Sequence, residues 1–481
     1  MLVDMTDAAR ARAAFDHPVI DADGHVVESF PVVVDYLRRI AGADVADRFS
    51  GSSPTYLSRS APLLERADAQ PVVRPGTAMT AWWALPTNAR DRATGFLPRL
   101  FHERLDEIGI DYAILYSSVG LACLAHPEDD VRVGACRALN TYLADVLDGL
   151  GDRLTAAAVI PTNTPDEAIA ELEHAVQQLG FKAAMFSSVV PRPLPEQGPG
   201  ARWLDVLALD SPYDYDPLWQ RCMDLGVAVT AHSGSQGLGL RVSASRYMYN
   251  HIGNFSSSAE AFAKALFFGG VTNRFRRLNF AFLECGVSWG VQLLCDLVDR
   301  WNKRGGQNIE HLDPGLVDAD EWDTLLDKYG GSIFADPDVR LAMRMQSDNP
   351  PAMVDDFRDA GVDGPEAIVS HFDRFFFGCE ADDATISCAY DNPLARTLQP
   401  MLGSDIGHWD VTDVDEVVPE AYELVEDGRL DAAQFRAFAC DNVIRLHGRM
   451  NPSFFVGTPV EGYASALLGA STAAPVGGKG G

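Results

Sequence analysis

The sequence contains no long apolar run and no closely spaced cysteine pair. No stretch reaches the ~20 apolar residues that a membrane-spanning helix needs, and the nearest, residues 261–271, contains Lys264. Residues 1–17 are charged and rich in alanine, which is unlike a secretory signal peptide. The eight cysteines are scattered without CxxC spacing, which argues against a disulfide scaffold or a cysteine zinc site. We therefore expect a cytoplasmic protein.

Basic residues are few in comparison with acidic ones. The chain of 481 residues has 39 Lys and Arg against 68 Asp and Glu, which gives a net charge of −29. A field of this sign repels nucleic acid and anionic membrane surfaces, so we expect neither as a partner. The apolar share of 47% and the charged share of 22% are those of an ordinary globular protein.

Strand-like and helix-like segments alternate along the chain. Thr164-Pro165-Asp166-Glu167 has the form of a helix-capping box, and Gly180 stands where that helix would end. Eight alternating strand–helix units predict a (β/α)8 TIM barrel rather than an open sheet. The expected strands are residues 18–24, 109–117, 154–160, 181–187, 227–232, 278–284, 374–379 and 398–404.

The chain is longer than a bare barrel, which needs ~250 residues. We expect one domain over residues 1–463, with large loop insertions at about 30–105 and 303–370. Insertions that follow strands lie over the active-site rim, so we expect both to shape a substrate pocket. The low-complexity tail, residues 464–481, is predicted to be disordered.

Acids and histidines follow the apolar runs of several predicted strands. Asp23 and His25 are two residues apart on strand 1, so both side chains point to the same side. His232, Glu284 and Asp405 end the fifth, sixth and eighth strands. Carboxylates and imidazoles that converge at one rim are the ligands of a divalent metal. With His251 from the loop after the fifth strand, the predicted metal ligands are Asp23, His25, His232, His251, Glu284 and Asp405.

Further polar residues lie near these positions. Asp21 and Glu28 flank the strand-1 pair, and an orienting role for a ligand histidine suits them better than direct ligation. Arg241 and Arg246 follow the strand-5 histidine and are candidates for binding an anionic part of a substrate. Glu380 and Asp382 follow the seventh strand, and His408 and Asp410 follow the eighth.

The motif residues resemble the amidohydrolase superfamily, in its branch of hydrolases and decarboxylases. The likeness rests on the strand-1 acid/His pair, on residues 230–234 and 403–410, and on the closing segment 440–448. It implies an orienting or acid/base role for His408 and Asp410. The family usually has His-x-His or Glu-x-His on strand 1 and often His on strand 6, where this chain has Asp23-Gly24-His25 and Glu284. Two-metal members commonly bridge their ions with a carbamylated lysine that ends strand 4, but Lys182 begins that strand here.

The number of candidate ligands bears on the number of ions. Six side chains exceed the three or four protein ligands of a single catalytic zinc. The mixture of carboxylates and imidazoles suits two ions, and iron or manganese suits it better than zinc. One zinc or manganese ion is the alternative.

Residues 21–28 and the glutamate-containing rim also resemble the TIM-barrel nonheme diiron monooxygenases, a group with diterpenoid hydroxylases of the platensimycin and platencin pathways. This resemblance implies two iron ions, O2 as cosubstrate and hydroxylation of a bulky, diterpenoid-type small molecule that is often carried as an acyl-CoA thioester. It also implies an electron-donating reductase and a homodimer. The alternative function is that of a metal-dependent hydrolase or decarboxylase. A third reading, an inactive barrel that serves as a binding module, predicts no bound metal.

Overall fold

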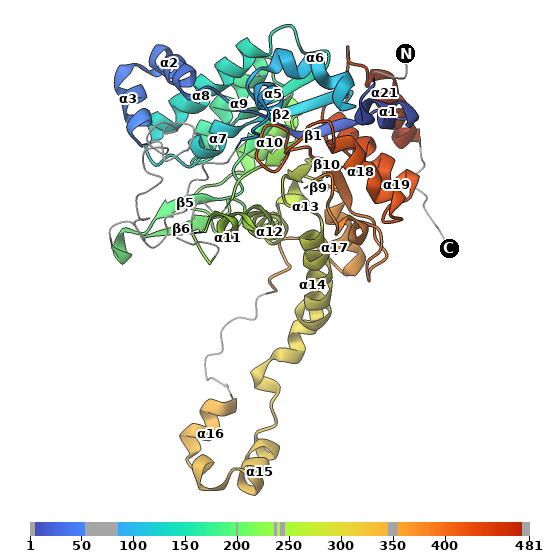
Figure 1. The fold of residues 1–481 in the computed structure, drawn as a ribbon. Helices are drawn as coiled ribbons and strands as arrows, with labels where there is room; N and C mark the ends of the chain where they lie inside the picture. Colours follow the sequence, from blue (N-terminus) through green and yellow to red (C-terminus); the bar gives the residue numbers. More distant parts are fainter. Residues whose placement is uncertain are drawn as a thin grey trace.

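Eight parallel strands form a nearly closed barrel surrounded by helices (Figure 1). The computed structural model describes residues 5–52, 85–198, 201–234, 238–240, 246–344 and 355–473. All eight predicted strands are present, with ends within a few residues of the expected ones. They are β1 (Ile20–Val26), β2 (Tyr112–Ser117), β3 (Leu154–Val159), β4 (Ala183–Phe186), β7 (Val229–Ala231), β8 (Phe280–Phe282), β9 (Phe375–Cys379) and β10 (Gln399–Leu402).

The first and last strands meet at the site end of the barrel. The strand order is β1-β2-β3-β4-β7-β8-β9-β10, and every hydrogen-bonded neighbour in this sheet is parallel. Beyond β10, the amide of Asp405 donates to the carbonyl of Asp23 (2.9 Å), and the amide of His25 donates to the carbonyl of Ile406 (3.0 Å). These two bonds join the ends of β1 and β10, so the barrel closes through residues of the candidate site.

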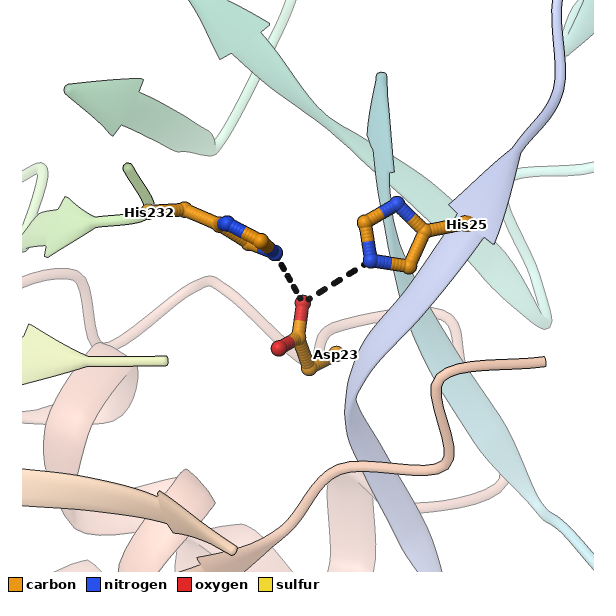
Figure 2. A group of neighbouring side chains, drawn as sticks. All are labelled: Asp23, His25 and His232. Atoms are coloured by element: carbon orange, nitrogen blue, oxygen red, sulfur yellow. Dashed lines mark ion pairs between the residues drawn. The ribbon is translucent and has the colours of Figure 1, made fainter. Parts of the chain in front are cut away.

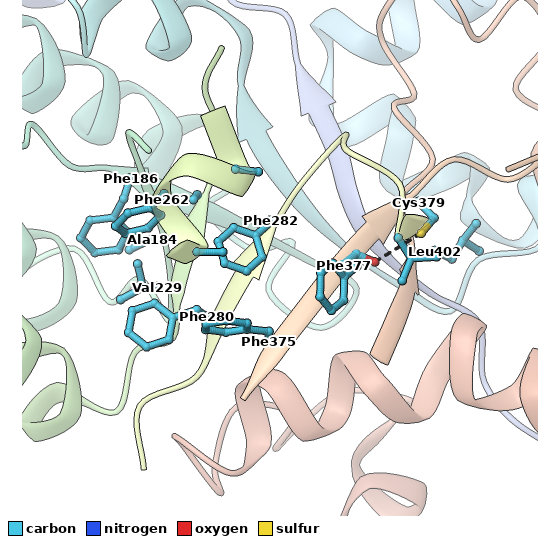
Figure 3. Close-up of a cluster of buried hydrophobic side chains, with 14 of the residues drawn as sticks. Ala184, Phe186, Val229, Phe262, Phe280, Phe282, Phe375, Phe377, Cys379 and Leu402 are labelled. Atoms are coloured by element: carbon cyan, nitrogen blue, oxygen red, sulfur yellow. Dashed lines mark hydrogen bonds between the residues drawn. The ribbon is translucent and has the colours of Figure 1, made fainter. Parts of the chain in front are cut away.

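Alternation along the strands divides the apolar residues into two sets. Phe280 and Phe282 of β8 lie in a cluster with Phe375 of β9, whereas Ala281 and Phe376 belong to a separate cluster. Successive side chains of a strand point to opposite faces, so one set faces the surrounding helices and the other the barrel interior. Figure 3 shows the first set, in which the aromatic rings of neighbouring strands lie against one another.

Most helices lie on the outside of the barrel. The capping box predicted at Thr164 and Glu167 is present at the start of α9. A short antiparallel hairpin, β5 (Val190–Pro193) and β6 (Arg202–Asp205), follows β4 and was not predicted. The helices of the barrel are α1 (Asp7–Ala14), α7 (Ser118–Cys123), α8 (Asp129–Val146), α9 (Pro165–Gln177), α10 (Asp216–Leu225), α11 (Tyr247–His251), α12 (Asn254–Phe268), α13 (Val271–Arg274), α14 (Ser288–Arg304), α17 (Pro365–Phe372), α18 (Val417–Glu426), α19 (Ala432–Arg436), η6 (Ala437–Asp441) and α20 (Asn442–Gly448).

The two insertions lie at different ends of the barrel. The first follows β1, and its residue Gly95 accepts a hydrogen bond from the amide of Val27 (2.8 Å) beside the candidate site. Residues 53–84 of this insertion lie outside the described residues. Its helices are α2 (Phe30–Ala41), α3 (Ala43–Ser52), α5 (Ala89–Phe96) and α6 (Pro98–Ile108).

The described part of the second insertion does not cover the site, contrary to the expectation from sequence. It leaves from the C-terminal end of α14 and projects away from the barrel as an arm (Figure 1). A helix that follows a parallel strand runs back towards the amino ends of the strands, so the arm begins at the rim opposite the site. Its elements are η2 (Gly306–Leu312), η3 (Pro314–Leu316), α15 (Ala319–Tyr329), η4 (Gly331–Phe334) and α16 (Pro337–Arg344).

The predicted disordered tail begins as a helix instead. Helix α21 spans Glu461–Ala473. Its residue Ala464 is buried, and Leu468 lies against Gly448 of α20, where a Cβ would come within 2.7 Å of the leucine. Packing on α20 therefore orders a stretch whose composition alone indicated disorder. Residues 474–481 lie outside the described residues.

None of the described helices has both the length and the apolar character required to cross a bilayer. All eight cysteines are free thiols.

A buried arginine ties the first insertion to the loop after β10. The Arg104 side chain is 3% exposed and contacts Asp91 (2.7 Å), Glu107 (2.9 Å) and Asp415 (3.2 Å). Truncating one partner of a buried ion network leaves uncompensated charge, so we expect Arg104→Ala to lower the free energy of unfolding by about 3–5 kcal/mol. The exposed Arg90, which pairs only with Glu107, is the control, and Arg90→Ala should cost less than about 1 kcal/mol. Urea denaturation of both variants measures the difference.

Candidate metal centre

Three predicted ligands converge at the carboxyl ends of β1 and β7. Figure 2 shows the imidazoles of His25 and His232 directed at one carboxylate oxygen of Asp23. Asp23 Oδ1 lies 3.7 Å from His25 Nε2 and 3.4 Å from His232 Nε2. Gly24 lies between the two β1 residues, and a Cβ there would come within 2.6 Å of Asp21 Oδ2. The close approach of the Asp21 carboxylate to this irregular part of β1 therefore needs glycine.

Asp405 brings a further carboxylate to His25. Its Oδ1 lies 3.1 Å from His25 Nε2. Ligand atoms bound ~2.1 Å from one ion in tetrahedral geometry lie about 3.4 Å apart. The separations of Asp23 from the two histidines and of Asp405 from His25 fall around that value, so an ion fits beside these groups without rearrangement of the strands.

The candidate ligand atoms are buried, and three of them make no hydrogen bond with other protein groups. Asp23 Oδ1, His25 Nε2 and His232 Nε2 are each inaccessible and lack a hydrogen-bond partner. Both carboxylate oxygens of Asp405 are also inaccessible, and Oδ1 lies 2.7 Å from Nδ1 of His408. Leaving a buried polar atom unpaired costs about 1–3 kcal/mol, and more when it is charged. Burial also lowers the pKa of His25 well below its ordinary value, which favours the neutral imidazole that binds metals. The donor set fits a divalent cation.

A second group of candidate ligands lies beside the first. One donor atom from each of His251, Glu284 and Asp410 lies within 4.8 Å of the other two. Glu284 Oε2 is 3.6 Å from His232 Nε2, so the two groups adjoin. All six predicted ligands are thus brought together, with Asp410 as an additional carboxylate. The arrangement could hold one ion in the first group and another in the second.

His408 lies next to Asp405 and over His25. Its Nδ1 is 2.7 Å from Asp405 Oδ1, and its Nε2 is 2.9 Å from the hydroxyl of Ser118. The rings of His408 and His25 lie 3.9 Å apart between centroids. Because both nitrogens of His408 have protein neighbours, its ring is held in one orientation at the edge of the centre.

Mutual proximity and burial raise the pKa values of several carboxyl groups. Desolvation raises the pKa of Glu284 well above its ordinary range, and the negative charges of Asp405 and Asp410 raise it further. The pKa of Asp405 is raised in the same way, by burial and by Asp23. These carboxylates repel one another in their ionised form, and a cation between them removes that repulsion.

Two ligand candidates adopt backbone conformations that L-residues rarely take. Glu284, immediately after β8, has φ 53°, and Asp405, after β10, has φ 52°. A non-glycine residue in the left-handed region carries strain, of order 1 kcal/mol, that the surrounding structure must hold in place. In both cases the strained turn directs a carboxylate into the centre.

Asp21 and Glu28 accept hydrogen bonds from groups of the barrel rim and do not orient a candidate ligand histidine, contrary to the expectation from sequence. Asp21 accepts hydrogen bonds from the amide of Ser404 (2.9 Å), its hydroxyl (2.6 Å) and the amide of Asp23 (3.1 Å). Glu28 accepts from the amide of Val119 (2.9 Å). These bonds anchor the segments after β10 and β2 to β1, so the effect of both carboxyls on the centre is indirect.

The centre opens into two cavities with acidic walls. The first, of about 400 Å³, is lined by Glu284, Glu380, Asp383 and Asp410 together with His251 and the aromatic rings of Phe255 and Trp409. The second, of about 440 Å³, shares Glu380, Trp409 and Asp410 with the first and is further lined by Asp382, Asp405, Asp413, Glu416 and Glu420. Among the described residues, no lysine or arginine lines either cavity.

Arg246, one of the two predicted substrate-binding arginines, does not line these cavities. Arg246 is exposed at the start of α11. Arg241 lies outside the described residues. Sequence reasoning missed Ser118 and Asp383, although Ser118 directly follows the apolar run of β2 and Asp383 follows that of β9 by four residues. Their positions after a strand could therefore have identified them as site residues. Serine and single aspartates are common in loops, however, so this position alone does not distinguish them.

Known protein families and solved structures resemble this chain. A protein-family model described as Amidohydrolase matches residues 20–330. Among solved structures, an amidohydrolase from Mycobacterium avium subsp. paratuberculosis is similar at 16% identity and a TM-score of 0.54, covering 90% of this chain and 99% of that one. The 2,6-dihydroxybenzoate decarboxylase from Rhizobium (15% identity, TM-score 0.48, 90% and 98% covered) is also similar. So is a dihydroxybenzoic acid decarboxylase from Polaromonas, solved with manganese and 2-nitroresorcinol (14%, 0.49, 92% and 99%).

Proposed function

Because the chain belongs to the amidohydrolase family, we propose that it is a metal-dependent enzyme that hydrolyses or decarboxylates a small molecule. The observation that carries this proposal is the convergence of Asp23, His25 and His232, whose buried donor atoms have no hydrogen-bond partner, with Asp405 Oδ1 beside His25. The catalytic ion would be held by these four residues. When bound, a divalent ion supplies Lewis-acid polarisation of a substrate carbonyl and activation of water.

The protein's own residues can bind the substrate and move protons. Asp410 lines both cavities and adjoins Asp405, so its carboxyl is placed to exchange a proton with a substrate in either cavity. His408, fixed between Asp405 and Ser118, is the second proton-transfer candidate. Phe255 and Trp409 offer flat apolar surface to the substrate.

The charge of the cavities favours hydrolysis over decarboxylation. A decarboxylase binds a carboxylate substrate, and the described walls offer carboxylates and no guanidinium or ammonium to pair with it. Along the described walls an anion would thus meet like charge, and the metal would be the cation that attracts it. An uncharged ester, amide or lactone meets no such barrier, so we propose hydrolysis of an uncharged substrate as the main activity.

A second candidate function is O2-dependent hydroxylation by two irons. The second group, His251, Glu284 and Asp410, favours it, because it supplies ligands for another ion beside the first. The combined set has three histidines and four carboxylates and needs no lysine bridge, since the Nζ of Lys182 donates to the carbonyl of Phe454 (3.0 Å) at the amino end of β4. Hard carboxylate ligands suit iron. On this proposal the protein requires O2 and an external electron donor, and a coenzyme A thioester is a candidate form of the substrate.

Metal content separates the two candidates. Protein expressed with supplemental iron and manganese is expected to bind one ion per chain as a hydrolase and two irons as an oxygenase. His251→Ala should leave the single ion of a hydrolase in place but remove one of two irons. The matched control is His102→Ala, because His102 is a surface histidine paired with Asp152 (2.9 Å). Elemental analysis per chain gives the count.

Activity assays then decide the reaction. Hydrolysis of uncharged aryl esters or lactones by the metal-loaded enzyme, without O2 consumption, would support the main proposal. Release of CO2 from aromatic carboxylates would replace hydrolysis by decarboxylation. Oxygen consumption that depends on a chemical reductant and on two irons would establish the second candidate instead. A chain that binds no metal under any of these conditions would contradict both.

A further inference from the structure

The arm formed by residues 306–344 has helices but no core. Not one of its residues is buried. Trp322 Nε1 donates to the carbonyl of Arg340 (3.3 Å) and Arg340 pairs with Asp327 (2.6 Å), so α15 and α16 are tied to each other. Figure 1 shows them well away from the barrel. Helices of this length gain most of their stability from packing an apolar face against another element, and none of the described residues covers theirs.

The arm also carries a concentration of exposed apolar side chains. Nineteen large apolar residues of the described chain are exposed, and nine of them lie in this arm. Patches of this kind on a monomer mark sites of protein association. The nine are Leu312, Leu316, Val317, Leu325, Tyr329, Ile333, Val339, Leu341 and Met343.

The arm is strongly acidic as well as apolar. Residues 306–344 contain nine Asp and Glu against three Lys and Arg, a net charge of −6. A partner surface that accepts it must therefore provide positive charge, which is scarce in a chain of net charge −29.

A group of arginines that form no close ion pair among the described residues lies at the end of the barrel from which the arm leaves, where the charge of Asp373 acts on two of them, Arg374 and Arg449. Arg276 and Arg277 precede β8, Arg374 precedes β9, and Arg449 follows α20. In the described part of the chain none of the four forms an ion pair: Arg276 bonds to Asn273, and Arg374 bonds to the carbonyl of Arg276. Arg374 Nε is buried without a partner. We call these four residues the arginine rim.

We propose that the arm of one chain docks on the arginine rim of a second copy, forming a reciprocal two-fold dimer. Arm and rim lie at the same end of the barrel, so two copies that face each other at this end each offer an arm to the other's rim. Such a contact is made twice, as two-fold symmetry requires. It covers the apolar arm, and it gives the exposed guanidinium groups of Arg276 and Arg277 their carboxylates. This association is independent of the reaction proposed above.

Sedimentation velocity of the full chain over roughly 0.1–50 μM tests the dimer. The unaltered chain is compared with two double variants, Ile333→Asp/Leu316→Asp in the arm and Arg276→Glu/Arg277→Glu at the rim. Each double variant should raise the dimer dissociation constant at least tenfold. Leu240→Asp, at a residue 94% exposed near the opposite rim, is the control and should change nothing. Because all the arm positions are exposed, metal content and circular dichroism should stay as in the unaltered protein.

Charge reversal tests the pairing itself. Asp320→Lys/Glu321→Lys in the arm should weaken the dimer alone, and mixing this variant with Arg276→Glu/Arg277→Glu should restore association, because opposite charges then meet in the mixed dimer. An unaltered chain that remains monomeric at 50 μM would overturn the proposal and assign the arm to a different protein. A dimer that all these variants leave intact would also overturn it, since another face would then form the contact.

Discussion

Asp23→Asn is expected to abolish metal binding and to lower activity by about a thousandfold or more. The substitution keeps the shape of the side chain but removes the charge that the structure places 3.4 Å from His232 Nε2 and 3.7 Å from His25 Nε2. A metal supplies several kcal/mol of stabilisation to a transition state, and each 1.36 kcal/mol corresponds to a tenfold change in rate. Elemental analysis and turnover of the metal-loaded enzyme measure the two losses.

The control for this experiment is a surface aspartate. Asp152 is 55% exposed and pairs only with His102, so Asp152→Asn should retain full metal content and activity. His232→Ala should behave like Asp23→Asn, because both remove a ligand of the same group. If Asp23→Asn retained its metal and its activity, the ion would have to bind elsewhere, and the centre built here from β1 and β7 would be wrong.

Metal-free protein is expected to lose stability as the pH rises, whereas metal-loaded protein is expected to gain it. Burial raises the pKa of Asp21 to about 6 and that of Glu28 to about 7, and the pKa values of Glu284 and Asp405 are raised further by burial and like charge. The unfolded chain releases these protons near pH 4. The folded chain therefore holds more protons from about pH 4 to 8, and its free energy of unfolding falls across that window.

Metal binding reverses the slope because the ligands must be deprotonated to bind the ion, so the affinity rises with pH. With free metal at a thousandfold excess over Kd, the gain is about 4 kcal/mol. Thermal unfolding between pH 5 and 8.5, with chelator and with manganese or iron, shows both trends. Glu284→Gln should flatten the decline of the metal-free protein, while the exposed Glu103→Gln should not. Equal slopes with and without metal would mean that these carboxyls do not face an ion.

The barrel could be predicted from sequence because its signal is local. Runs such as residues 278–284 and 374–379 combine apolar character with strand length, and the capping box at Thr164 marks the helix between two of them. Strand ends also carry the candidate ligands, so the positions of Asp23, His232 and Asp405 followed from the same pattern. The six predicted ligands lie together because all strand ends of a barrel meet at one rim.

Features that depend on distant contacts could not be predicted. The fixed orientation of His408 depends on Ser118, 290 residues away in sequence. The arm was expected over the site, and this expectation was wrong. The direction of the arm is set by how far α14 continues beyond the barrel, and no local sequence pattern encodes that length. The alanine-rich composition of α21 alone predicts a disordered tail. The helix is ordered because Gly448 of α20 leaves space for the side chain of Leu468.

The closure of the barrel through its own ligands has a consequence for biosynthesis. Asp21 and Ser404, which bring the first and last strands together, are 383 residues apart. A ribosome adds residues from the N-terminus at about 5–20 per second, so Asp23 and His25 wait on the order of 20 seconds or more before Asp405 emerges. The nascent chain thus has no complete cradle for a cation during most of its synthesis. The cation is then taken up after translation of the barrel is finished, from whichever pool the cell maintains at that moment. Recombinant protein should accordingly carry the ion that its growth medium supplies.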